Sequence, residues 1–265
     1  MWRTQHVHAR VATSLPGGRS TSHSYAAPAQ PLAPSGWSWP DPGSADASGI
    51  LGFGADLEPE TLVDAYRRGI FPWPHDDTPL PWFSPDPRAV IAVGGVRTSR
   101  SLRQRLRRSG WETTFDAAFE EVIEGCAEPR PGQGTWITPE MVVAYRRLHR
   151  LGWAHSMEVW DGEQLVGGLY GVQVGACFTG ESMFHRVSDA SKVALVDLAA
   201  RMRDAGGEVV DAQLPTEHLS RMGAVDMPRE EFLEGLESWR ARDIRLPVER
   251  RPVDMLAPLL AVRPA

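Results

Sequence analysis

Hydrophobic positions at helical spacing predict a series of helices in the first 151 residues of the chain. Leu102 and Leu106 are the inward-facing residues of one of these helices, and Thr138 followed by Pro139 has the N-cap and first-turn residues of another. The segments with this spacing are residues 59–68, 99–109, 115–123 and 138–151.

After Gly152 the pattern changes to the alternation and β-branched content that are typical of strands. Asp161-Gly162 between two such runs is a strong signal for a β-hairpin. Helical spacing returns at residues 190–205 and 228–239. The predicted strands are residues 155–160, 164–171, 172–183 and 208–214. These elements predict an α+β (mixed α/β) fold, in which helices cover a largely antiparallel sheet.

Three segments, 1–46, 70–88 and 246–265, show neither helical spacing nor strand alternation. Residues 1–46 are rich in Ser, Pro, Ala and Gly, and we expect them to form a disordered leader. Many prolines between residues 70 and 88 predict irregular structure, which could form a rigid aromatic-lined loop or simply pack in the core. We therefore expect domains at the following positions: a small N-terminal domain at 47–92, a larger domain at 93–245 and a loose C-terminal tail at 246–265.

Composition excludes several classes of protein. The chain has 265 residues, of which 42% are hydrophobic, enough to bury a sizeable core. No apolar run approaches the roughly 18 residues of a membrane span, and the N-terminus lacks the hydrophobic stretch of a secretory signal. Cys126 and Cys177 are the only cysteines and form no CxxC motif, so we expect reduced thiols in a cytoplasmic protein.

Motifs for metals and cofactors are also missing. The only HxH spacing is His6-Val7-His8 in the predicted leader, and the chain contains no HExxH spacing, no glycine-rich phosphate loop and no GxSxG nucleophile motif. The histidines that we considered as metal ligands are too scattered to form one site: His149, His155, His185 and His218. We expect no metal, no cofactor and no covalent catalysis.

The basic residues are almost all arginine, 27 of 28, and Lys192 is the only lysine. Genomic base composition is the simplest cause of this bias. Residues 97–108 nevertheless combine six arginines with no acidic residue, in a chain of net charge −6. On a helix, Arg100, Arg103 and Arg107 share one face. This face could contact the phosphates of a nucleic acid, and a helix surface that only meets solvent is the open alternative.

Polar residues inside two apolar strands are the candidates for chemistry. Glu181 lies between Phe178 and Phe184, where a carboxylate requires a partner. That partner could be a substrate ammonium group or the other half of a buried salt bridge. Asp211 and Gln213, two residues apart on a strand, point to one face. Asp211 could polarise Gln213, whose amide can orient an amine but is too weak a base to remove its proton fully. The alternative is a polar pair that joins strand to loop.

Ordered segments throughout residues 50–236 resemble the leucyl/phenylalanyl-tRNA–protein transferase family. The matching segments are 54–57 (GADL), 65–73 (AYRRGIFPW), 82–90 (WFSPDPRAV), 134–139 (GTWITP), 148–156 (LHRLGWAHS), 165–171 (LVGGLYG), 180–184 (GESMF), 190–192 (ASK) and 211–213 (DAQ). No single segment is specific, but the ordered set is.

The resemblance implies that residues 93–245 form a catalytic domain similar to the GNAT acetyltransferases. It implies transfer of Leu, Phe or Met from aminoacyl-tRNA to proteins that begin with Arg or Lys, which marks them for degradation by the N-end rule pathway. An aminoacyl ester is already activated, so the reaction requires positioning of an amine and no cofactor. We expect a monomer.

The resemblance also assigns roles to residues at matching positions. Glu181, Asp211 and Gln213 would be the polar residues of the reaction centre. Trp73 and Trp136 would lie near the terminal adenosine of the tRNA. The remaining assignments are the substrate-site residues Phe178, Ser182, Met183 and His185, and the acceptor-stem contacts Arg100, Arg103, Arg105 and Arg107. Of the substrate-site residues, Phe178 and Met183 would line the apolar pocket. His185 replaces the serine of many relatives, so the preference among amino acids is open.

Two other functions are compatible with parts of this pattern. An acyl-CoA-dependent GNAT N-acetyltransferase would need a pyrophosphate-binding loop, and the nearest segment, residues 203–208, lacks its last small residue. A non-enzymatic RNA-binding module would require neither Glu181 nor Gln213.

Overall fold

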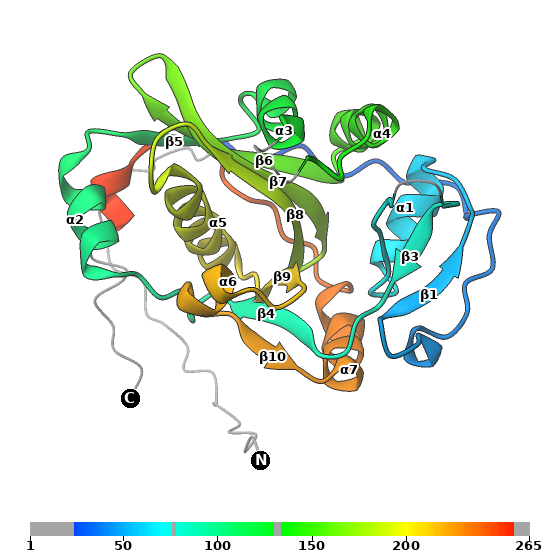
Figure 1. Ribbon diagram of the computed structural model, residues 1–265. Helices are drawn as coiled ribbons and strands as arrows, with labels where there is room; N and C mark the ends of the chain where they lie inside the picture. The colour runs from blue at the N-terminus through cyan, green and yellow to red at the C-terminus, as the bar shows by residue number, and fades with distance from the viewer. Residues whose placement is uncertain (1–23, 76–77, 130–133, 257–265) are drawn as a thin grey trace, which may run out of the picture.

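The computed structural model describes residues 24–75, 78–129 and 134–256, and within these ranges the chain is a mixed α/β protein (Figure 1). The larger sheet has the strand order β10-β4-β9-β8-β7-β6-β5-β11, and the smaller has the order β1-β3-β2. The strands are β1 (Ile50–Phe53), β2 (Phe71–Pro72), β3 (Pro81–Phe83), β4 (Arg88–Ala92), β5 (Glu112–Phe115), β6 (Ala154–Asp161), β7 (Gln164–Val174), β8 (Cys177–His185), β9 (Val209–Gln213), β10 (Val225–Met227) and β11 (Arg251–Pro252).

Helices cover both faces of the larger sheet (Figure 1). They are α1 (Pro59–Tyr66), α2 (Arg100–Arg108), α3 (Phe119–Ala127), α4 (Pro139–Arg150), α5 (Ala190–Ala205), α6 (Glu217–Arg221) and α7 (Arg229–Trp239), with 3-10 turns η1 (Pro42–Ser44) and η2 (Val253–Leu256). One core lies between the sheet, α2 and α5, and a second lies under α1, α3 and α4. No helix among the described residues has the length and hydrophobicity to cross a bilayer.

Local sequence signals account for most helix ends. The Thr138 hydroxyl accepts a hydrogen bond from the amide of Met141 at 3.3 Å and begins α4, as predicted. Ser99 caps α2 in the same way through the amide of Leu102. Gly206, in the left-handed region at φ +85°, ends α5 at the predicted residue. The predicted hairpin is confirmed, with Asp161 paired to Gln164.

Several predicted elements are wrong in detail. Phe115 ends strand β5 and does not belong to α3, because its spacing to Phe119 matches a helix only by coincidence. The strand predicted over 172–183 is the end of β7, a turn at Gly175 and most of β8. The proline-rich segment forms β2 and β3, whose prolines lie in short strands of a small sheet, where few ladder hydrogen bonds are lost.

Parts of the predicted leader (residues 1–46) and of the predicted tail (246–265) pack against the rest of the protein. Residues 24–46 pack on the domain: Ala26 is buried and Trp39 meets Trp82 edge to face at 4.7 Å between ring centroids. At the other end, Leu246, Val253 and Leu256 are buried in the α5 core. The rest of the predicted leader and tail lies outside the described residues. Residues 88–92, which we placed in the small domain, form β4 of the larger sheet.

One feature of the sheet topology determines the position of the site. Strands β8 and β9 are parallel neighbours, connected through α5, in an otherwise antiparallel sheet. Their pairing covers only Cys177 to Thr179 against Val209 to Asp211. Beyond these residues β8 continues along β7 without β9.

Candidate active site

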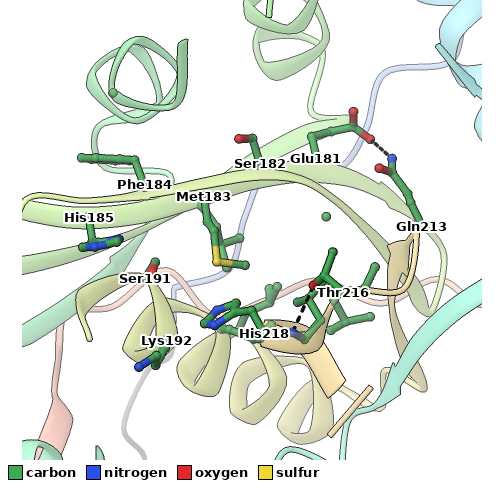
Figure 2. A pocket seen from close by; sticks show the side chains of 18 of the residues that line it. Glu181, Ser182, Met183, Phe184, His185, Ser191, Lys192, Gln213, Thr216 and His218 are labelled. Carbon is green, nitrogen blue, oxygen red and sulfur yellow. Dashed lines mark hydrogen bonds between the residues drawn. The ribbon is translucent and has the colours of Figure 1, made fainter. Parts of the chain in front are cut away.

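A cavity of about 1090 Å³ opens where β8 and β9 separate, and α5 and α6 close its other side (Figure 2). One part of its wall is apolar, and the polar residues discussed below surround the rest. The apolar wall consists of Ile91, Leu169, Met183, Leu195, Leu198, Val210 and Leu219.

A β-bulge in β8 directs Glu181 to the edge of this cavity. Opposite β7, Gly180 pairs with Gly171 and Ser182 pairs with Tyr170, so Glu181 is the additional residue. Figure 2 shows Glu181 and Ser182 on one side of the strand and Met183 on the other, above α5. The bulge therefore places the carboxylate and the apolar pocket on opposite sides of one strand.

The Glu181 carboxylate is 8% exposed and has protein partners on both oxygens. Its Oε2 accepts a hydrogen bond from the Tyr145 hydroxyl at 3.0 Å, and that hydroxyl also bonds to the hydroxyl of Tyr66. Its Oε1 accepts from Nε2 of Gln213 at 2.8 Å. Burial raises the pKa of Glu181 to about 7, against the opposing effect of the two tyrosine hydroxyls. This group therefore titrates near neutrality.

Gln213 has a left-handed backbone, with φ +63°. Few non-glycine residues adopt this conformation, and it persists where neighbouring contacts enforce it. Here the amide N–H of Gln213 donates to Oδ1 of Asp211 at 2.9 Å. The turn directs the side chain to Glu181, which holds Nε2 and leaves the amide Oε1 with no hydrogen bond among the described residues. A free carbonyl oxygen at a cavity edge can accept a hydrogen bond from an amine.

Asp211 is fully buried, and an ion pair with Arg88 uses both of its oxygens. Arg88 donates to them at 2.8 and 2.7 Å, and the Thr179 hydroxyl adds a bond at 3.1 Å. The Asp211 carboxylate contacts the backbone of Gln213 and not its side chain, so it anchors the turn.

Arg88 itself is a site residue that the sequence analysis missed. Its guanidinium lies 4.8 Å from the ring centre of Phe71 and 4.6 Å from that of Phe232, and it donates to the carbonyl of Gly69 at 3.1 Å. It connects β2 and α7 to the site. The available signal was a single arginine within a proline-rich segment, which gives no indication of its partner.

The predicted substrate residues separate into two groups. Ser182, Met183 and His185 line the cavity, as do the three predicted reaction-centre residues. Phe178 does not: it is fully buried in the α5 core and packs against Gly171 of β7, where a Cβ would lie 2.5 Å from its ring. Phe178 lies on the same face of β8 as Met183 and packs behind the apolar wall, so its contact with the substrate side chain stays a prediction.

Trp73 and Trp136 lie outside the cavity as well. Both pack at the edge of the core under α1, α3 and α4, and Trp73 lies 5.5 Å from Phe83 between ring centres. Tyr66 and Tyr145 belong to the same core. The two tryptophans therefore lie on the side of the sheet to which Glu181 points, and their contact with a nucleotide stays a prediction.

Helix α2 presents its arginines to solvent, while Leu102 and Leu106 are buried as predicted. None of the six arginines of residues 97–108 forms an ion pair within the described part of the chain, and Arg105 lies 5.2 Å from the ring centre of Trp111. Unpaired charge of one sign on one helix favours a polyanionic partner.

Three further residues of the cavity wall had no predicted role in the site: Ser191, Lys192 and His218. Burial lowers the pKa of His218, and Lys192 and His185 lower it further. No group of three or more potential metal ligands occurs among the described residues.

The cavity has an apolar wall, and an oriented amide and a buried carboxylate lie at its edge. This arrangement suits a transferase that aligns an apolar substrate group with an incoming nucleophile. Comparison with known proteins narrows this class. Residues 90–237 match the family model for leucyl/phenylalanyl-tRNA protein transferase, and residues 55–86 match the N-terminal domain of that family.

Close relatives have the same name. The leucyl/phenylalanyl-tRNA–protein transferase of Aromatoleum aromaticum is 55% identical, over 73% of this chain and 82% of its own length. Those of Anaeromyxobacter dehalogenans and Shewanella putrefaciens are 56% and 50% identical, over 75% of this chain and 86% and 85% of theirs. The chain therefore belongs to the leucyl/phenylalanyl-tRNA protein transferase family.

Proposed function

We propose that this chain transfers Leu, Phe or Met from aminoacyl-tRNA to the N-terminal amine of proteins that begin with Arg or Lys, which marks them for degradation by the N-end rule pathway. The observation that supports this best is the hydrogen bond between Gln213 and Glu181 at the edge of the apolar cavity. Family membership supports the donor and the reaction type.

The chemistry requires little beyond alignment. An α-amino group has a pKa of about 8, so part of it is neutral near pH 7. One N–H of the neutral amine donates to Oε1 of Gln213 while its nitrogen attacks the ester carbonyl. The ester bond to the ribose then breaks, and the proton lost by the amine ends on the ribose oxygen. Glu181, held by Tyr145, fixes the direction of the Gln213 amide throughout.

The cavity supports the proposed choice of amino acid. Met183, Leu195 and Leu219 offer no partner for a polar side chain, so polar amino acids are disfavoured. Leu, Phe and Met differ from each other by apolar surface alone, and such a wall separates them by only about 1–3 kcal/mol. Glu181, on the other side of β8, is charged above its pKa of about 7, and this charge suits an acceptor with a cationic first residue.

We also propose the broader properties that the family resemblance implies. Residues 93–245 are assigned to the GNAT-like class, which the parallel β8–β9 pair inside an antiparallel sheet supports. The chain is expected to act as a monomer in the cytoplasm, without a cofactor. The exposed arginines of α2, namely Arg100, Arg103, Arg105 and Arg107, are expected to contact the acceptor stem, and Trp73 and Trp136 the terminal adenosine.

A transfer assay tests the proposal directly. Purified protein is incubated with radiolabelled Leu-tRNA and a peptide that begins with Arg, beside matched peptides that begin with Asp or have an acetylated N-terminus. Label is expected on the Arg peptide alone. No label on any peptide, or label from acetyl-CoA in place of Leu-tRNA, would overturn the proposal.

A further inference from the structure

The cavity is larger than one amino-acid side chain requires. A closed cavity of roughly 150 Å³ is enough to hold a benzene ring, while this cavity, which is open to solvent, measures about 1090 Å³. The additional space lies beside the start of α5, where His185, Ser191, Lys192 and His218 line the wall (Figure 2). This polar end is separate from the Glu181–Gln213 pair, and the transfer reaction described above makes no use of it.

The first turn of α5 presents unpaired donors to this space. Within the described residues, the backbone amides of Ser191 and Lys192 donate to no oxygen, and the side chain of Asp189 does not cap the helix. Ser191 is only 5% exposed, its hydroxyl has no hydrogen bond to any residue that the structure describes, and it points into the cavity (Figure 2). Because α5 is 16 residues long, its positive end favours an anion at this position.

One lysine and two histidines line the same part of the cavity. Lys192 is close enough to His218 to lower the pKa of that imidazole, after the larger effect of burial, and His185 acts in the same direction. The two acids of this end of the cavity wall are each paired, Asp189 with Lys192 at 2.7 Å and Glu128 with Arg186 at 3.3 Å. A lowered pKa keeps the His218 imidazole neutral, and a neutral imidazole can donate one hydrogen bond to an anion.

This end of the cavity also leads to helix α2. Asp189 lines a second cavity of about 370 Å³, whose other walls include Arg105 and Arg108. The unpaired arginines of α2 and the start of α5 thus border two adjoining spaces that share a wall residue. A chain of phosphates could pass from one to the other.

Lys192 is the only lysine among 28 basic residues. Base composition accounts for the arginines but not for this exception. An ammonium group is a compact charge with three donors, whereas a guanidinium is a broad planar fork. The first turn of a helix beside a buried serine suits the smaller group.

We propose that the start of α5, through the amides of Ser191 and Lys192, the Ser191 hydroxyl, the Lys192 ammonium and His218, binds a backbone phosphate of the single-stranded 3′ end of the tRNA. This site rests on the proposed function. It fixes the terminal nucleotides relative to Gln213, so that the ester reaches the amine at one position. The same chemistry could hold the phosphate of a free small molecule such as coenzyme A, and the experiments below distinguish the two sources.

The first experiment compares two donors that differ in phosphate. Leucine is esterified either to adenosine, which has no phosphate, or to the trinucleotide CCA, which has internal phosphates. In Lys192→Ala, KM for the trinucleotide donor is expected to rise about tenfold, the loss of one charge-assisted hydrogen bond, while the adenosine donor reacts as before. Ser191→Ala is expected to act in the same direction. The matched control is Arg221→Ala, which removes an exposed charge near His218 outside the cavity wall.

If Lys192→Ala raised KM equally for both donors, the phosphate site would be overturned, because the substitution would then affect the cavity in general. A wild-type protein that transfers from neither donor would instead contradict the proposed function, so the two failures are distinguishable.

The second experiment uses the single lysine as a reporter. An amine-acylating reagent modifies Lys192 and the chain's α-amine alone, and mass spectrometry of peptides follows the rate at Lys192. Aminoacyl-tRNA is expected to slow the reaction at Lys192 strongly, while coenzyme A at the same concentration leaves it unchanged. Equal protection by coenzyme A would overturn the assignment to RNA, and no protection by either would overturn the site.

Discussion

The side-chain amide of Gln213 donates to the Glu181 carboxylate at 2.8 Å, so Glu181 determines which end of that amide faces the substrate. The sequence suggested that Asp211 polarises the Gln213 side chain, but the Asp211 carboxylate accepts a hydrogen bond only from the backbone amide of Gln213. The two acids therefore have separate tasks: Glu181 orients the side chain, and Asp211 with Arg88 holds the strained turn from which it extends.

Gln213→Ala should lower kcat by about 100-fold, because the amine loses the group that aligns it. KM for aminoacyl-tRNA should change little, since Gln213 contacts neither the apolar wall nor α2. Steady-state kinetics with varied tRNA would measure both. If binding fell as much as turnover, Gln213 would be a binding residue and the proposed alignment would be wrong.

Arg88→Met should destabilise the fold by about 3–5 kcal/mol, because it leaves the Asp211 carboxylate buried without its partner. The double variant Arg88→Met/Asp211→Asn removes the stranded charge and should recover much of that loss in urea unfolding. It should still have a reduced kcat, since Phe71 and Phe232 lose the cation between them and the turn loosens. Full recovery of kcat in the double variant would show that Arg88 has no positioning role.

The sequence predicted features that depend on local chemistry. Thr138, Gly206 and the Asp161 hairpin define element ends through their own backbone preferences, and the structure has them where expected. Features that depend on distant partners were missed. Arg88 meets Asp211 across 123 positions of sequence, and no periodicity indicates such a pair.

The β-bulge in β8 was the second feature that the sequence did not predict. Strict alternation would place Glu181 and Met183 on one face of β8, but the extra residue at the bulge separates them. Phe178, before the bulge, lies on the same face as Met183. The packing of residues 24–46 was missed because composition describes only the average of a segment. The contacts come from individual residues, such as Trp39 and Ala26.

Reversal of three charges on α2, Arg100→Glu, Arg103→Glu and Arg107→Glu, should raise KM for aminoacyl-tRNA and flatten its salt dependence. Each lost phosphate contact should reduce the slope of log affinity against log salt by about 0.9 on a duplex. The Leu102 and Leu106 face is untouched, so the melting temperature serves as the control. An unchanged salt slope would place the acceptor stem elsewhere.

Deletion of residues 1–45 should lower stability, since it removes the Trp39 contact with Trp82 and the hydrogen bond from Ala26 to Leu246. Trp39→Ala alone should cost about 1–2 kcal/mol, less than the loss at a fully buried aromatic residue, because Trp39 is half-buried. Differential scanning calorimetry of both variants would measure this. A deletion variant that melts like the full chain would show that these contacts contribute nothing.

Glu181→Gln and Glu158→Gln together test the electrostatics of the site. Burial raises the pKa of both carboxyls to about 7. Glu158 is held by Ser156 and Thr114, away from the cavity wall, and so provides a matched control. Between pH 4.5 and 7 the unfolded chain loses these protons while the folded chain keeps them, so stability falls as pH rises and is constant above that range.

Each Gln variant should therefore gain stability relative to wild type at pH 8 but not at pH 4, by about 3 kcal/mol at most per carboxyl. Only Glu181→Gln should lose activity, because a neutral amide at 181 can accept from Tyr145 or donate to Gln213 and no longer fixes which end of Gln213 faces the amine. Urea unfolding and kcat over this pH range would measure both effects. If Glu158→Gln lost as much activity as Glu181→Gln, the loss would follow from altered stability, and the orienting role of Glu181 would be wrong.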